Sequence, residues 1–272
     1  MAHGRMDHDR YETDDQWPCA QASRGTVEAT RDQRRMSPHR KTSLAAGALY
    51  LLTFVSIPTL ALYVPVHASN YILGPGPDTG VIFGGILEMI VALACIGTAV
   101  ALYPVVKRQN EGIALGFVGA RVLEAGSILA GVACLLSVVT LRQGAAGTEA
   151  LVTGHALVAL YDRLFLLGQS FLPAVNALLL GSLLYQSRLV PRVRPLLGFI
   201  GAPLLVAADI AVLFGLIGQH APAAGLAALP IALWEFSLGG WLVVKGFKPS
   251  AITALYSRPG DLDTGSVAPA AR

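Results

Sequence analysis

Val81 to Val106 reads VIFGGILEMIVALACIGTAVALYPVV, and this stretch decides the fold class of the chain. Glu88 is its only charged residue. A transmembrane helix needs about 20 mostly apolar residues, because each residue rises about 1.5 Å and the hydrocarbon core is about 30 Å thick. The stretch therefore predicts a helix that crosses a membrane.

Five other stretches of the chain pass the same test. The six predicted membrane-spanning helices cover about residues 44–66, 81–106, 113–141, 155–185, 196–218 and 223–244. The composition agrees, since 54% of the residues are hydrophobic and 14% are charged, against about 25% charged in a soluble domain. We predict an all-α fold, an integral membrane bundle of six transmembrane helices over residues 41–248, with the lipid bilayer as its surroundings.

The basic residues of the connecting segments indicate the orientation. Lys107 and Arg108 follow the second span, Arg192 follows the fourth, and Lys245 follows the sixth, whereas the opposite connections hold only Arg142. Positive residues favour the cytoplasmic face. We expect both termini in the cytoplasm of a bacterial cell, with the bundle in the inner membrane. These residues lie in short loops and form no continuous basic face, so we expect no nucleic-acid partner.

Both ends of the chain are polar. Residues 1–40 have no apolar periodicity and are expected to form a disordered tail, with Met36 as an alternative start of the protein. Residues 249–272 are rich in Gly, Pro, Asp and Ala, and a second disordered tail is expected there.

Charged residues inside the spans define the candidate site. With two neighbouring amides they are Glu88, Arg121, Glu124, Asp162, Arg163, Gln169, Asn176, Asp209 and Glu235. A charge at mid-membrane costs roughly 2.5 to 3.5 kcal/mol, so each should face protein or water and mark the interior of the bundle. Five are acids and two are bases, which leaves three carboxyls without a cationic partner. Such carboxyls suit proton binding or the attraction of a cation.

The fourth span carries the most specific pattern. His155, Asp162, Gln169 and Asn176 recur every seven residues and should lie along one helical stripe. Pro173 cannot donate a backbone hydrogen bond, so a kink or break is expected near it. Small residues beside the acids of the second and sixth spans let helices approach closely. We expect the second, fourth and sixth helices to converge around a polar centre.

Other chemistry has little support in the sequence. There is no His-Glu-x-x-His, Gly-x-Ser-x-Gly or Cys-x-x-Cys motif, so no catalytic residue is assigned and an enzyme is not favoured. His67, His155 and His220 map to the same end of the bundle, but none has ligand spacing within its own segment. We therefore predict no metal and no cofactor.

Several blocks of sequence, in order, are similar to one known family. They are Asn70 to Gly74, Ile96 to Val100, Leu102 to Gly112, Ala120 to Glu124, Val175 to Gly181, Ser187 to Pro191 and Trp234 to Gly239. Over about residues 40 to 250 the chain resembles the bacterial family catalogued as domain of unknown function 4386. The resemblance implies a multi-pass membrane protein and leaves its activity open.

The sequence is compatible with three functions. The excess of acids at membrane depth favours transport or permeation of a small solute, or proton-coupled transport. Alternatively, the charges are interhelical contacts, worth about 0.6 kcal/mol each, in a sensor or an assembly component. A membrane-embedded enzyme or haem protein is the third. A homo-oligomer or a membrane partner is compatible with each.

Overall fold

The computed structural model describes residues 37–74, 76–144 and 147–257. The chain divides into two compact units, Met1–Pro38 and His39–Arg272, and the packing reported below lies within the second. The predicted tails at 1–36 and 258–272, with Met36, lie outside the described residues.

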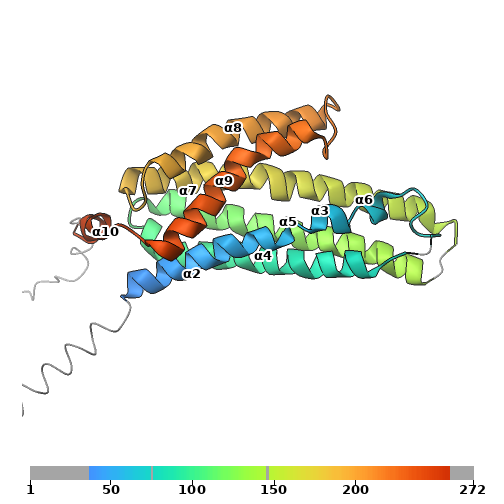
Figure 1. Ribbon diagram of the computed structural model, residues 1–272, viewed down its shortest axis with the longest axis horizontal. Coiled ribbons are helices and arrows are strands. Elements are labelled where there is room, and N and C mark those ends of the chain that lie inside the picture. The colour runs from blue at the N-terminus through green and yellow to red at the C-terminus, as the bar shows by residue number, and fades with distance from the viewer. Residues whose placement is uncertain (1–36, 75, 145–146, 258–272) are drawn as a thin grey trace, which may run out of the picture. The chain divides into compact units, whose positions relative to one another are not determined.

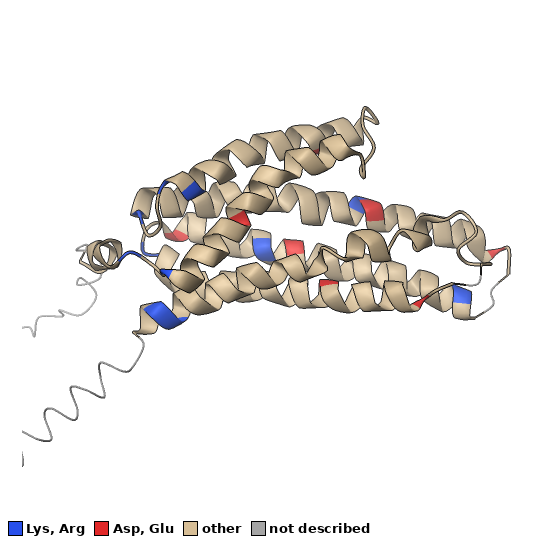
Figure 2. Cartoon of the chain, viewed as in Figure 1, with Lys and Arg blue, Asp and Glu red and all other residues tan. Residues whose placement is uncertain are grey.

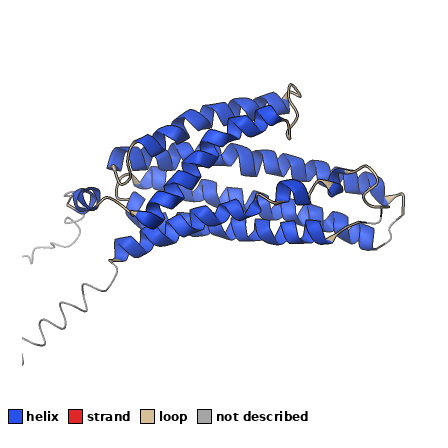
Figure 3. Ribbon diagram, viewed as in Figure 1, coloured by secondary structure: helices blue, strands red, loops and turns tan. Residues whose placement is uncertain are grey.

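Every regular element of the described residues is helical (Figure 3). The α-helices are α2 (Pro38–Leu52), α3 (Thr59–Leu62), α4 (Thr79–Val106), α5 (Glu111–Gln143), α6 (Ala150–Phe165), α7 (Leu172–Ser187), α8 (Val193–Leu213), α9 (Pro222–Val244) and α10 (Pro249–Tyr256). Two 3-10 helices, η1 (Thr53–Ser56) and η2 (Pro65–His67), and a π-helix, η3 (Leu166–Phe171), complete them.

Six helical segments are long and apolar enough to cross a membrane, as predicted. They are Pro38–Leu62, Thr79–Val106, Glu111–Gln143, Ala150–Ser187, Val193–Leu213 and Pro222–Val244. The long helices α4 and α5 run side by side, with α6 against α5 and α8 against α9 (Figure 1). Figure 2 shows Lys and Arg gathered where α2 begins and α9 ends. Helix α5 ends at the opposite end of the bundle (Figure 1), and its last turn holds Arg142. We call these the basic end and the Arg142 end.

The surface of the bundle is apolar, unlike that of a soluble protein, and a few charged side chains lie within its mainly apolar core. Leu93 is 67% exposed and Phe214 78% exposed, whereas Glu88 is fully buried and Arg121 is 1% exposed. Hydrocarbon accepts exposed apolar side chains but cannot solvate charge, so this distribution suits a protein surrounded by lipid.

The first span is not the continuous helix predicted for residues 44–66. Its α-helix ends at Leu52, and η1, α3 and η2 follow. The hydroxyls of Thr53, Ser56 and Thr59 donate to carbonyls three residues earlier, at 2.7, 3.2 and 2.6 Å. Pro58 has no N–H to continue the α-helical pattern. The prediction of a continuous helix did not account for the combined effect of Thr53, Ser56, Pro58 and Thr59.

The fourth span is irregular where Pro173 predicts it. Residues Leu166–Phe171 form the π-helix η3, which joins α6 to α7. Pro173 cannot donate to the carbonyl of Gln169, and a π-helix changes the register of that carbonyl row. Single-turn π-helices are frequent at functional sites.

The prediction of a disordered tail is wrong for residues 249–256. These residues form α10, in which Ala251 and Leu255 are buried. The ring of His39 packs edge-on against Tyr256 at 5.0 Å, and the Arg108 guanidinium lies 4.0 Å from the centre of the same ring. Pro249 at the first turn favours helix initiation, which the composition of this segment did not reveal.

Candidate functional site

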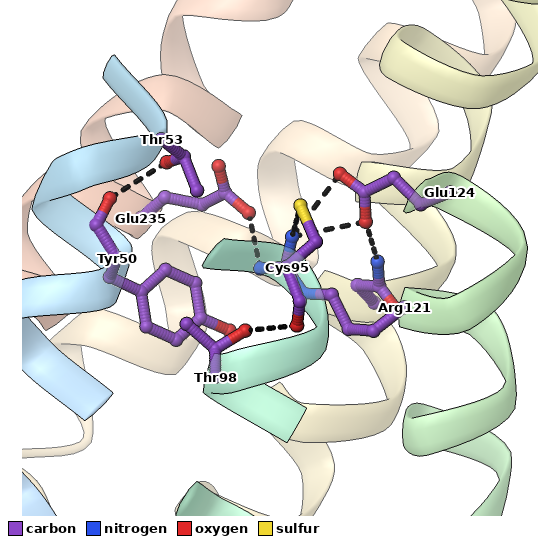
Figure 4. A network of polar contacts seen from close by, with 8 residues as sticks. Tyr50, Thr53, Cys95, Thr98, Arg121, Glu124 and Glu235 are labelled. Carbon is purple, nitrogen blue, oxygen red and sulfur yellow. Dashed lines mark hydrogen bonds and ion pairs between the residues drawn. The ribbon is translucent and has the colours of Figure 1, made fainter. Parts of the chain in front are cut away.

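Arg121 of α5 is the centre of a buried polar network (Figure 4). Its guanidinium donates to Glu124 on the same helix at 3.0 Å and to Glu235 of α9 at 2.8 Å. It also lies 3.6 Å from the thiol of Cys95 and 4.9 Å from the ring centre of Tyr50. Arg121 thus pairs with Glu124, three residues away on the same helix, and with Glu235 on another.

Asn176 extends the network to α7, where its amide donates to Glu124 at 2.6 Å. We call Arg121, Glu124, Asn176 and Glu235 the Arg121 cluster. With one cation for two carboxyls, every charge in it is held by hydrogen bonds between helices. Such a cluster is expensive to disturb, because removing one partner leaves another buried and unpaired.

A second group of polar residues surrounds η3. The amide of Gln169 donates to Glu88 of α4 at 3.3 Å, and the hydroxyl of the next residue, Ser170, donates to Asp209 of α8 at 2.6 Å. Tyr161 also donates to Glu88, at 3.2 Å. Neither carboxyl forms an ion pair with any residue that the structure describes, and the second oxygen of each is buried without a hydrogen-bond partner there. The π-helix therefore lies between two acids that only neutral donors hold.

A surface pocket of about 280 Å³ shares Tyr161 with this group. It is lined by Thr59, Leu60, Tyr63, Val64, His67, Tyr161, Phe165 and His220, and we call it the His67 pocket. The rings of Tyr63 and Tyr161 meet edge to face at 5.5 Å. The hydroxyl of Tyr161 bonds Glu88, so a wall of the pocket is in direct contact with a buried carboxyl.

His67 and Asp162 form a contact at the edge of the pocket. The Nε2 atom of His67 is 3.0 Å from a carboxylate oxygen of Asp162, and Nδ1 is 2.8 Å from the carbonyl oxygen of Tyr63. The hydrogen bond to Asp162 raises the pKa of His67 above its ordinary value; burial opposes this and the Tyr63 carbonyl adds to it. Arg163 instead donates to Gln219 at 3.2 Å.

The structure thus divides the predicted polar centre into three groups. The first group is the Arg121 cluster. The second consists of Gln169 in η3 with the acids Glu88 and Asp209, which bond η3. The third, Asp162 and Arg163, faces the loop between α8 and α9. The expectation of a single centre among the second, fourth and sixth helices was too simple, because the third helix supplies Arg121. Tyr63 and Tyr161 were missed, since an aromatic residue in an apolar span carries no polar signal of its own.

Fold and site together define a multi-pass α-helical membrane protein with ionisable groups sealed inside its bundle. Residues 45–246 match the family described as Domain of unknown function (DUF4386), and the chain belongs to that family. No curated protein and no solved structure matches the chain. The function must therefore be argued from the site itself.

Proposed function

We propose that this protein, in the inner membrane of a bacterial cell, carries a small solute or protons across the bilayer, with Glu88 binding the coupling proton. The observation that supports this is the contact between Tyr161, a wall of the His67 pocket, and Glu88. A carboxyl with no countercharge in a low-dielectric site can take up and release a proton without breaking an ion pair.

The two polar groups would have different roles in this mechanism. Glu88 and Cys95 lie seven residues apart on α4, about 10 Å along its axis, and Gln169 and Asn176 have the same separation along the fourth span. The same two segments therefore contact both groups, because Cys95 of α4 lies 3.6 Å from Arg121 and Asn176 belongs to the Arg121 cluster. Ion pairs fix the Arg121 cluster. The hydrogen bonds from the neutral side chains of Tyr161 and Gln169, at 3.2 and 3.3 Å, are weaker and leave Glu88 freer to change partners.

The π-helix offers a way to connect proton binding to movement. Gln169 and Ser170 are successive residues of η3 and donate to Glu88 and Asp209 respectively. Protonation of either acid weakens the hydrogen bond that holds η3 on that side, because a neutral carboxyl is a poorer acceptor. A shift of η3 would then change the position of α6, which carries Tyr161 and the pocket wall.

Proton flux into proteoliposomes tests the proposal. With an internal pH-sensitive dye and an imposed potassium diffusion potential, vesicles containing the protein should equilibrate protons faster than empty vesicles. Glu88→Gln should reduce the rate to that of empty vesicles. Glu111→Gln is the matched control, because Glu111 is exposed at the start of α5, and it should behave as the unmodified protein. Full flux with Glu88→Gln would overturn the role of Glu88, and equal rates for protein-containing and empty vesicles would overturn proton permeation by the protein alone.

The second candidate function is that of a membrane sensor or assembly component. The Arg121 cluster supports it, because that cluster joins α5, α7 and α9 as an interhelical connector would. For this function, the Glu124→Gln variant should unfold more easily or lose a partner on purification. Neither the variant nor the unmodified protein should show proton flux.

A further inference from the structure

Three potential metal ligands from separate parts of the chain converge beside the His67 pocket. One ligand atom each from His67, Asp162 and His220 lies within 4.8 Å of the other two. His67 follows the first span, Asp162 belongs to α6, and His220 belongs to the loop between α8 and α9. The rings of the two histidines meet edge-on with centres 5.6 Å apart.

The hydrogen bonds of His67 point one ring nitrogen at this site. The carbonyl oxygen of Tyr63 can only accept a hydrogen bond, so Nδ1 of His67, 2.8 Å away, carries the proton. In metal sites a histidine typically donates one N–H to a carbonyl or carboxylate and binds the ion with the other nitrogen. Nε2 faces Asp162 at 3.0 Å, close to the separation of two ligand atoms on one ion with bonds of about 2.0 Å.

Gln219 holds the third ligand in place. Its side-chain amide donates to the backbone carbonyl of Asp162 at 3.0 Å and its oxygen accepts from Arg163 at 3.2 Å. These bonds attach the loop that carries His220 to α6. The guanidinium of Arg163 bonds Gln219, whereas the carboxylate of Asp162 contacts His67.

We propose that His67, Asp162 and His220 bind one divalent transition-metal ion of the Zn²⁺ class, with a fourth ligand position open to the His67 pocket. Two imidazoles and one carboxylate suit Zn²⁺, Co²⁺ or Ni²⁺, whereas Mg²⁺ and Ca²⁺ prefer oxygen ligands. Three protein ligands with an open position are typical of zinc sites that exchange a water or a solute. The site does not depend on the proposed transport activity, because its binding can be measured in the absence of a membrane gradient.

Titration of the full chain with metal tests the site. The purified protein, treated with a chelator and freed of it, is titrated with Zn²⁺ by calorimetry and with Co²⁺ by visible absorbance. We expect one ion per chain, and Co²⁺ absorption bands of a tetrahedral site. His67→Ala and His220→Ala should each weaken binding by more than about tenfold, since even outer-shell partners contribute that much.

His155→Ala is the matched control. His155 lies at the same end of the bundle, but its ring bonds the carbonyl of Ser69 at 2.9 Å and is not one of the three converging ligands. The His155→Ala variant should bind metal as the unmodified protein does. His220 is exposed, so its loss should leave the thermal unfolding of the metal-free protein unchanged. No saturable binding, or equal loss of binding in the His155 and His220 variants, would overturn the proposal.

Discussion

At the scale of single residues, the buried charges follow one physical requirement. An ionised group that hydrocarbon cannot solvate must find hydrogen bonds within the protein. The pair Arg121 and Glu124 could be predicted from their spacing of three on one helix. The pair Arg121 and Glu235 could not, because the two residues are 114 positions apart, and only the packing of α5 with its neighbours brings them together.

Arg121→Gln should destabilise the protein by about 3 to 5 kcal/mol, because it leaves the buried Glu124 and the partly buried Glu235 without a cation. The free energy of unfolding in detergent micelles measures this. Changing all three residues to Gln should recover part of the loss, since no uncompensated charge remains. Arg163→Gln is the control and should cost less than about 1 kcal/mol. Equal effects of the Arg121 and Arg163 changes would contradict the assignment.

Asp78, outside the spans, provides a pH prediction. Burial disfavours its ionised form, but hydrogen bonds from Tyr71, Gln143 and Arg142 outweigh this and lower its pKa below the ordinary 3.8. Because the pKa of Asp78 is lower in the folded state, its carboxylate stabilises the fold at pH values above its ordinary pKa. This stabilisation is lost as the pH falls through the lower pKa of the folded state. The temperature at the midpoint of thermal unfolding should therefore decrease as the pH is lowered from the ordinary pKa of Asp78 through its pKa in the folded protein.

Asp78→Asn is the matching variant for this prediction. It should unfold at a lower temperature near neutral pH and lose less on acidification than the unmodified protein. A variant that loses as much stability in acid as the unmodified protein would show that other carboxyls account for the acid sensitivity.

At the scale of elements, the sequence predicted the existence of the six spans better than their continuity. Length and hydropathy report the free energy of inserting a segment into lipid, so a helix long enough to cross a membrane was predicted at each of the five places from 79 to 244 where the structure has one. The fourth segment begins at Ala150 rather than His155, and the fifth ends at Leu213 rather than Gly218. The breaks in the first span and the π-helix depend on hydrogen bonds of individual hydroxyls and prolines, which a hydropathy average removes. Helix α10 was missed because its stability comes from packing against the basic end.

Close packing of α2 on α9 gives an element-scale prediction. A Cβ atom added at Gly47 would come within 2.7 Å of the carbonyl oxygen of Gly239 and 2.8 Å of the backbone nitrogen of Val243. Gly47→Ala should therefore separate the two helices and cost about 1 to 3 kcal/mol, as overpacking does. The free energy of unfolding measures this.

Gly240→Ala is the control for that change, because a Cβ atom added there meets nothing within 4 Å. It should leave the stability unchanged or raise it by up to about 1 kcal/mol, because alanine favours a helix over glycine. If both substitutions are neutral, α2 and α9 do not approach as closely as described.

At the scale of the whole molecule, the chain is a bundle whose two ends differ in charge and in chemistry. The basic end holds α10, whereas the other end holds Arg142, which bonds Asp78 and the carbonyl of Gly74. Hydropathy predicted the bundle, and the cost of charge in lipid predicted the burial of Glu88, Arg121, Glu124 and Asp209. The same prediction is wrong for Arg163, which is exposed. Which acids lie together could not be predicted, because that depends on helix rotation and on the register change at η3.

Orientation is a prediction at this scale. The excess of Lys and Arg at the basic end should place it in the cytoplasm. In intact cells, a membrane-impermeant thiol reagent should label a cysteine introduced at Thr148, near Arg142, and not one introduced at Arg192. Labelling at Arg192 alone would reverse the assignment and place the His67 pocket on the cytoplasmic side.

The central claim is that Glu88 is a membrane-embedded carboxyl that accepts a proton, whereas the acids of the Arg121 cluster are held in ion pairs. An apolar carbodiimide modifies protonated carboxyls within lipid, and peptide mass spectrometry locates the adduct. In membranes containing the unmodified protein, we predict an adduct on Glu88 and none on Glu124. An adduct on Glu124 with Glu88 unmodified would contradict the account.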